Sequence, residues 1–168
     1  VSASGDVPEV ASVPLPFSSP AHIGVSPAGD YLSTAHYGSK ATTLISLGDD
    51  GVFDDFKDSY EHRGSGPHRV QTQSRPHWAG FTPDGTRLHV TDLGSDEIWT
   101  FAVDHDKSQL KLLHKTGLPA GSGPRHMAFT ADQKFAYVSD ELSHHVSVFE
   151  YDAAAGTFSS LQHIDAAP

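Results

Sequence analysis

The sequence contains no cysteine, so a disulfide framework and a thiolate metal site are excluded and the redox compartment is left open. It has no apolar run near the about 18 residues that a membrane-spanning helix needs, and its start lacks the basic and apolar segments of a signal peptide. We therefore expect a soluble protein that does not contact membranes. Positive charge is scarce too: the formal net charge of −10 argues against nucleic-acid binding.

One short pattern occurs three times along the chain, at residues 20–39, 76–95 and 124–143. With Val25, Phe81 and Phe129 taken as equivalent, successive copies lie 56 and 48 residues apart. A repeat of this length built from short strands predicts a propeller or an array, because one unit cannot bury its apolar face without neighbours.

Each copy has the features of an antiparallel sheet. In the second copy a Pro-Asp-Gly turn separates two short runs, and a third run alternates large and small residues with the period of two that one-sided burial requires. The four runs are residues 77–81, 87–91, 98–103 and 110–115. The position before the first bulky residue of strand one is small in every copy (Gly24, Gly80 and Ala128), which would let the innermost strands approach closely.

The predicted fold class is therefore all-β: a β-propeller of four-stranded antiparallel blades, with about three blades in the chain and virtually no helix. The expected repeats of this single domain are residues 20–75, 76–123 and 124–168. Because closed propellers usually have four to eight blades, three cannot close a ring, and their flanks would expose large apolar patches. We expect the remaining blades from another chain, from a copy of this chain or from a removed segment.

Some residues carry narrower expectations. The extra length of the first repeat falls in residues 49–75, which we interpret as a long, polar, functional loop, with a disordered insertion as the alternative. Gly-Ser-Gly-Pro occurs at residues 64–67 and 121–124 and is interpreted as a backbone device that turns the chain inward. Four side chains should be divided between inter-blade core and blade faces: Trp99, Phe101, Val148 and Phe149.

Five stretches carry a family resemblance: Gly-Ser-Gly-Pro-Arg-His-Met-Ala-Phe at 121–129, Tyr-Val-Ser-Asp-Glu-Leu-Ser at 137–143, Val-Ser-Val-Phe at 146–149, Val-Thr-Asp-Leu-Gly-Ser-Asp at 90–96, and Pro-His at 76–77 before Phe-Thr-Pro-Asp-Gly at 81–85. They resemble the lactonase family of seven-bladed propellers, which contains propeller-type 6-phosphogluconolactonases and fungal carboxymuconate-lactonizing enzymes. The resemblance implies a partial seven-bladed propeller, with about two blades missing on either side. Two departures are Ser-Arg-Pro-His at 74–77, where the family commonly has Pro-His-Ala-His, and His36, where an Asn is usual.

The hairpin geometry independently gathers polar residues at one rim. Strand one starts at Ala21, His77 or Arg125, and the antiparallel strand two ends near Tyr37, Asp92 or Glu141, so these positions share one mouth of the central channel. Propellers usually place their ligand sites there.

Three of these residues are the catalytic candidates. His77 is predicted to be a general base or proton shuttle, the alternative being a rim histidine that caps backbone groups. Arg125 is expected to bind a substrate anion, or else to form an inter-blade salt bridge with Glu141. Glu141 would orient Arg125 or act as acid or base. The two-residue alternation predicts that Arg125 faces the same way as Met127, and His77 the same way as Ala79.

Three further residues are candidates for substrate binding. Asp92 and Asp140 follow strand two, where formation of the turn is the favoured interpretation. His126 lies opposite Arg125 on its strand, which favours packing between blades. The adjacent His144 and His145 sit in a turn, and no His-x-His pair or carboxylate triad is present, so we expect no metal and no cofactor.

The resemblance implies hydrolysis of an anionic sugar-acid lactone such as 6-phosphogluconolactone, or lactone closure of a muconate. The sequence has neither a Gly-x-Ser-x-Gly elbow nor a cysteine, so direct attack by water is favoured over a covalent acyl-enzyme. The alternative from another class is a non-catalytic propeller that binds a partner or a glycan at the same rim, because a fold does not by itself define a function.

Overall fold

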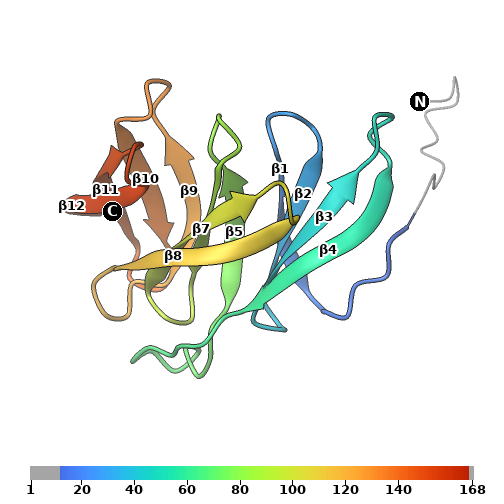
Figure 1. Ribbon diagram of the computed structural model, residues 1–168. Helices are drawn as coiled ribbons and strands as arrows, with labels where there is room; N and C mark the ends of the chain where they lie inside the picture. The colour runs from blue at the N-terminus through green and yellow to red at the C-terminus, as the bar shows by residue number, and fades with distance from the viewer. Residues whose placement is uncertain (1–11, 167–168) are drawn as a thin grey trace, which may run out of the picture.

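The computed structural model describes residues 12–166, and this part of the chain consists of β-strands joined by turns and loops (Figure 1). Twelve strands form three four-stranded antiparallel sheets, each built from strands consecutive in sequence. The first blade is β1 (Pro20–Val25), β2 (Tyr31–His36), β3 (Ala41–Leu47) and β4 (Phe53–Glu61); the second is β5 (Pro76–Phe81), β6 (Arg87–Asp92), β7 (Glu97–Asp104) and β8 (Gln109–Gly117); the third is β9 (Pro124–Phe129), β10 (Phe135–Asp140), β11 (His145–Asp152) and β12 (Thr157–Asp165).

The predicted fold class is confirmed. The three blades stand side by side in Figure 1, with β5 packed between β1 and β9, as expected for the innermost strands of a propeller. Residues 12–166 contain no helix that is long and apolar enough to cross a membrane.

The close approach of neighbouring innermost strands is confirmed at Gly24. A Cβ atom added there would lie 2.5 Å from the carbonyl oxygen of Ala79 on β5, so no larger residue fits without moving the strand. At Gly80 the space is filled instead by the indole ring of Trp78, and the constraint is therefore a side chain of the same strand.

The prediction of one long loop over residues 49–75 was wrong in part, because β4 occupies Phe53–Glu61 within it. β4 is an outer strand whose residues are mostly exposed, and two register shifts against β3 interrupt its alternation of apolar and polar residues. Both features conceal a strand from a search for period two. The loop itself covers residues 62–75 and projects from the lower rim in Figure 1.

The second Gly-Ser-Gly-Pro stretch is the backbone device that was expected. Gly121 and Gly123 both adopt positive φ, and their N–H groups donate to the carboxylate of Asp96 at 2.7 Å each. Asp96 also accepts from the Gln71 side chain at 2.6 Å. One buried carboxylate therefore ties loop 62–75 to the segment that leads into β9.

Apolar clusters fill the spaces between the blades. Trp99 and Phe101 belong to the cluster between the first and second blades, and Ile98 and Phe149 to the cluster between the second and third. Adjacent residues of β7 thus supply opposite clusters, as the pleat requires. Val148 is also buried, but it lies outside both clusters.

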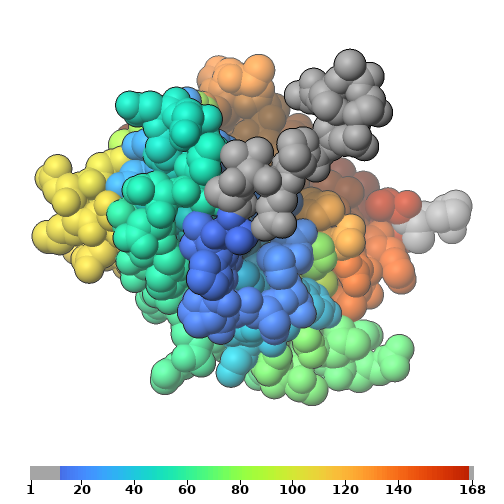
Figure 2. Space-filling view, turned by 90° about the vertical axis from the view of Figure 1, so that its right-hand side faces the viewer, coloured from blue at the N-terminus to red at the C-terminus, as the bar shows by residue number. Residues whose placement is uncertain are grey.

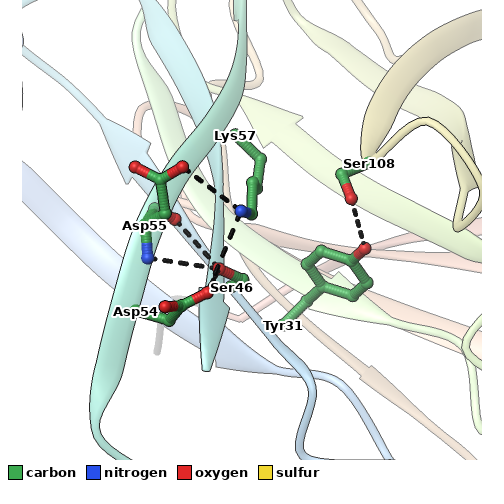
Figure 3. Close-up of polar contacts among 6 residues, drawn as sticks. All are labelled: Tyr31, Ser46, Asp54, Asp55, Lys57 and Ser108. Carbon is green, nitrogen blue, oxygen red and sulfur yellow. Dashed lines mark hydrogen bonds and ion pairs between the residues drawn. The ribbon is translucent and has the colours of Figure 1, made fainter. Parts of the chain in front are cut away.

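Polar side chains connect the blades as well. The Tyr31 hydroxyl of β2 is 2.7 Å from the Ser108 hydroxyl in the β7–β8 turn (Figure 3), and His89 of β6 is hydrogen bonded to the Tyr151 hydroxyl of β11 at 3.0 Å. Figure 3 also shows Lys57 beside two carboxylates of β4, which mark the acidic outer edge of the first blade.

Replacement of Phe101 by alanine should lower the free energy of unfolding by about 3 to 5 kcal/mol, because this ring is fully buried and its removal leaves a cavity. Urea denaturation of the chain measures the loss. The matched control is Leu113→Ala on β8, a side chain that is 42% exposed and should cost less than about 1 kcal/mol. A loss that small for Phe101 would contradict the strand register.

Burial, and then the charge of Arg87, lowers the pKa of His89 to about 3 from its usual 6.5. Between pH 6.5 and pH 3 this histidine is protonated in the unfolded chain but not in the folded one, so the free energy of unfolding falls as the pH drops below 6.5. Between pH 7 and pH 5 this residue should cost about 2 kcal/mol of unfolding free energy. His89→Gln should remove that part of the pH dependence, measured by denaturation at both pH values. His144→Gln, which changes an exposed histidine, should leave it intact.

Candidate active site

Each innermost strand begins with the same irregularity. In β1, β5 and β9 one extra residue interrupts the pairing with strand two, and the extra residues are Ala21, His77 and Arg125. Such a β-bulge re-aims the side chain that it carries. The alternation predicted from β9 does not hold across the bulge, since Met127 is 6% exposed in the core while the Arg125 side chain is 44% exposed at the rim.

The structure brings the three catalytic candidates together. Nε of Arg125 donates to Nε2 of His77 at 3.1 Å and lies 2.7 Å from Oε2 of Glu141. His77 is buried, whereas Arg125 and Glu141 are each nearly half exposed. The guanidinium of Arg125 thus contacts both the buried imidazole of His77 on the second blade and the half-exposed carboxylate of Glu141 on the third.

Burial lowers the pKa of His77 below its usual 6.5, and the positive charge of Arg125 lowers it further. The imidazole is therefore neutral at neutral pH. Because Nε2 accepts the hydrogen bond from Arg125, the ring proton resides on Nδ1. Nδ1 is buried and has no hydrogen-bond partner among the described residues.

Aromatic rings surround His77 on the same rim. The Tyr37 ring meets it edge-on with centroids 5.8 Å apart, and the His126 ring does so at 5.2 Å. His126 is exposed and also lies near His22 of the first blade, with ring centroids 6.2 Å apart. It therefore borders the candidate site and does not lie in the apolar core. Partial desolvation of the ring, followed by the charge of Arg125, lowers the pKa of His126.

The two aspartates lie beneath this rim. Asp92 is fully buried, and its Oδ1 accepts from the backbone N–H groups of Arg75 at 2.6 Å and Gly94 at 2.9 Å. Its Oδ2 is 3.4 Å from Nδ1 of the equally buried His62. These contacts fit the interpretation of a turn-forming aspartate.

Asp140 is the equivalent residue of the third blade. Its Oδ2 accepts from the Ser147 hydroxyl at 2.6 Å and is 3.5 Å from Nδ1 of His163. Burial raises the pKa of Asp140, partly offset by the Ser147 hydrogen bond. Together with Arg125 and Glu141 it lines a depression of ≈ 510 Å³, so a small molecule has access to the ion pair.

Two residues next to the site were not among the candidates. Tyr37 follows β2, and Arg75 ends loop 62–75, with its Cζ 4.8 Å from the centroid of the Tyr37 ring. The signal for Tyr37 was its place at the end of strand two. Nothing in the spacing of the sequence reveals that Arg75 lies over it, because loop 62–75 determines that contact.

Histidines and carboxylates are numerous, but no group of three or more within residues 12–166 is placed to hold a metal ion. The rim brings together an imidazole, a guanidinium and a carboxylate.

Four-stranded antiparallel blades with a polar site at the channel rim define the β-propeller class. The sequence model of the family described as Lactonase, 7-bladed beta-propeller, matches residues 2–168. The chain belongs to that family.

Known relatives agree with this assignment. The 6-phosphogluconolactonase of Bacillus subtilis (strain 168) is 35% identical over 150 residues, covering 89% of this chain and 42% of that protein. The periplasmic gluconolactonase PpgL of Pseudomonas aeruginosa superimposes with a TM-score of 0.84 at 30% identity, over 90% of this chain and 44% of that one. A Lactobacillus plantarum protein of known structure superimposes with a TM-score of 0.83 at 33% identity, over 89% of this chain and 43% of that one. The chain therefore spans less than half the length of these relatives.

Two charge changes should move the pKa of His77 in opposite directions. Arg125→Gln removes a positive charge that disfavours the imidazolium, so the pKa should rise toward 6.5; Glu141→Gln removes a negative charge that favours it, so the pKa should fall. NMR titration of the ring measures both. Glu150→Gln, on the exposed part of β11, is the control and should leave the pKa unchanged. Shifts of the same sign in both site variants would refute the arrangement described above.

Proposed function

We propose that this chain carries the catalytic rim of a lactone hydrolase, which opens a sugar-acid lactone such as 6-phosphogluconolactone by direct attack of water. The observation that carries the proposal is the array of His77, Arg125 and Glu141, in which a neutral base and a cation adjoin. The names of the relatives, 6-phosphogluconolactonase and gluconolactonase, support the reaction class.

Substrate binding is the first step of the proposed mechanism. In the free site Nε–H of Arg125 donates to Nε2 of His77, so the lone pair with which His77 would accept a proton is not available. A lactone carbonyl oxygen is a competing acceptor for the same guanidinium. When Arg125 turns to that oxygen, Nε2 of His77 becomes free, so binding of the substrate itself activates the base.

The chemical step then uses both groups. Nε2 of His77 takes a proton from water while the water oxygen bonds to the carbonyl carbon, and Arg125 stabilises the resulting oxyanion. Collapse of the tetrahedral intermediate breaks the bond between the carbonyl carbon and the ring oxygen. The proton on His77 passes to the departing ring oxygen, which yields the open hydroxy acid and restores the neutral imidazole.

The remaining candidates support this array. Glu141 keeps the guanidinium at the rim through their ion pair, and it partly counters the effect of Arg125 on the pKa of His77. His126 borders the mouth and would hydrogen bond a substrate hydroxyl. Asp92 and Asp140 support the rim from below, Asp92 through the turn and Asp140 through neighbouring side chains.

The proposal includes the rest of the ring. The described residues form three blades, and the family is seven-bladed. The third blade exposes Tyr137, Leu161 and Ile164, each between 43% and 51%. We assign these apolar side chains to the interface with the remaining blades, which would also close the channel around the site.

In the completed propeller, His77→Ala should lower kcat for a sugar lactone by about 10² to 10⁴, the usual contribution of a positioned base. KM should change little, because the imidazole acts on water and not on the bound substrate. Continuous titration of the acid released measures the rate.

The matched control is His105→Ala, a histidine near the opposite rim that bonds to Gly85. It should retain full turnover. If His77→Ala retains it too, the base is another group. An absence of turnover on both sugar and muconate lactones by the unmodified protein would support the non-catalytic binding role instead.

A further inference from the structure

A second guanidinium stands at the same rim. Arg75 is the last residue of loop 62–75 before β5, and this loop projects at the lower edge of the molecule in Figure 2. The Arg75 guanidinium lies over the face of Tyr37, and its Nε donates to the carbonyl oxygen of Val70 at 2.8 Å. Its backbone N–H donates to the buried Asp92. Backbone, Nε and ring face therefore all hold Arg75 in place before any ligand arrives.

Arg75 lacks the acidic partner that Arg125 has. Its two terminal amino groups make no hydrogen bond or ion pair with the rest of the described chain, whereas Arg125 is paired with Glu141. The chain has 21 acidic residues against 11 basic ones, so carboxylates are not in short supply. A half-buried guanidinium with two unoccupied donor groups is arranged to receive an anion.

The position of Arg75 relative to the proposed base is set by one side chain. The Tyr37 ring contacts the guanidinium of Arg75 through its face and the His77 ring edge-on. The two functional groups are thus separated by a single aromatic ring. This is the scale of a six-carbon lactone whose carbonyl lies at one end and whose charged substituent lies at the other.

We propose that Arg75, held by Tyr37, forms a second subsite that binds the phosphate group of a phosphorylated sugar-acid lactone. The inference rests on the function proposed above and deepens it, because it divides the work between two arginines. Arg125, beside His77, serves the carbonyl oxygen. Arg75 grips the remote phosphate through its planar fork of N–H donors, which matches two phosphate oxygens at once.

Binding can be tested on the completed propeller by isothermal titration with two hydroxy acids, 6-phosphogluconate and gluconate, which differ only in the phosphate. The wild-type chain should bind the phosphorylated acid more tightly. Arg75→Gln should weaken the binding of 6-phosphogluconate by about tenfold and leave the binding of gluconate unchanged. The reason is that only the phosphorylated acid loses a charge-assisted hydrogen bond. Arg69→Gln, an exposed arginine of the same loop, is the charge-matched control and should alter neither.

Equal weakening of both acids, no preference of the wild type for the phosphorylated one, or an equal effect of Arg69→Gln would each overturn the subsite. Tyr37→Leu supplies an independent variant if Arg75→Gln disturbs the loop. It keeps the charge but removes the surface that positions it, and it should reduce the preference for the phosphorylated acid.

Kinetics of the completed propeller separate this inference from the proposed hydrolysis. Arg75→Gln should raise KM about tenfold for 6-phosphogluconolactone and not for gluconolactone, with kcat nearly unchanged for both. If the protein binds the phosphorylated acid selectively but shows no turnover, the proposed hydrolysis is refuted and the proposed phosphate subsite stands. Turnover that is indifferent to Arg75→Gln would refute the subsite and keep the hydrolase.

Discussion

A four-stranded blade has two apolar faces and can bury each one only against another blade, and the rest of this structure depends on that constraint. It requires the innermost strands to approach until Gly24 meets the backbone of β5. It also makes β7 supply one cluster with Ile98 and the other with Trp99. Residues that follow the regular alternation of side chains along an inner strand pack against the neighbouring blades. The candidate catalytic side chains lie where this alternation is interrupted: the β-bulges re-orient His77 and Arg125 at the rim.

Buried polar groups hold that rim in place. The Asp96 carboxylate collects two backbone N–H groups and the Gln71 amide, and Asp92 holds the backbone of Arg75. Such contacts are favourable because the donors would otherwise be buried without partners. They connect loop 62–75 to the second and third blades. The loop is therefore fixed where it presents Arg75, although none of its residues is part of a strand.

Much of this arrangement could be predicted from the sequence because it repeats. Three aligned copies place strand one and strand two, and antiparallel pairing then brings His77, Arg125 and Glu141 to one rim without further information. β4 was missed because its register shifts and exposed face conceal the period of two. The contact of Arg75 with Tyr37 was missed for another reason. It depends on the path of loop 62–75, which is longer than the equivalent connection before β9 at residues 118–123.

The proposed site contains two arginines whose charges are compensated to different degrees. Glu141 lies 2.7 Å from Arg125, so this pair presents little net charge to an approaching ligand. The chain as a whole is acidic, with a formal net charge of −10, and repels anions at a distance. An anionic lactone therefore needs a local cation that is not already neutralised, and Arg75 is such a cation. In the proposed reaction a substrate held at Arg75 would then displace His77 from Arg125 through its carbonyl oxygen, so that attraction of the anion would precede activation of the base.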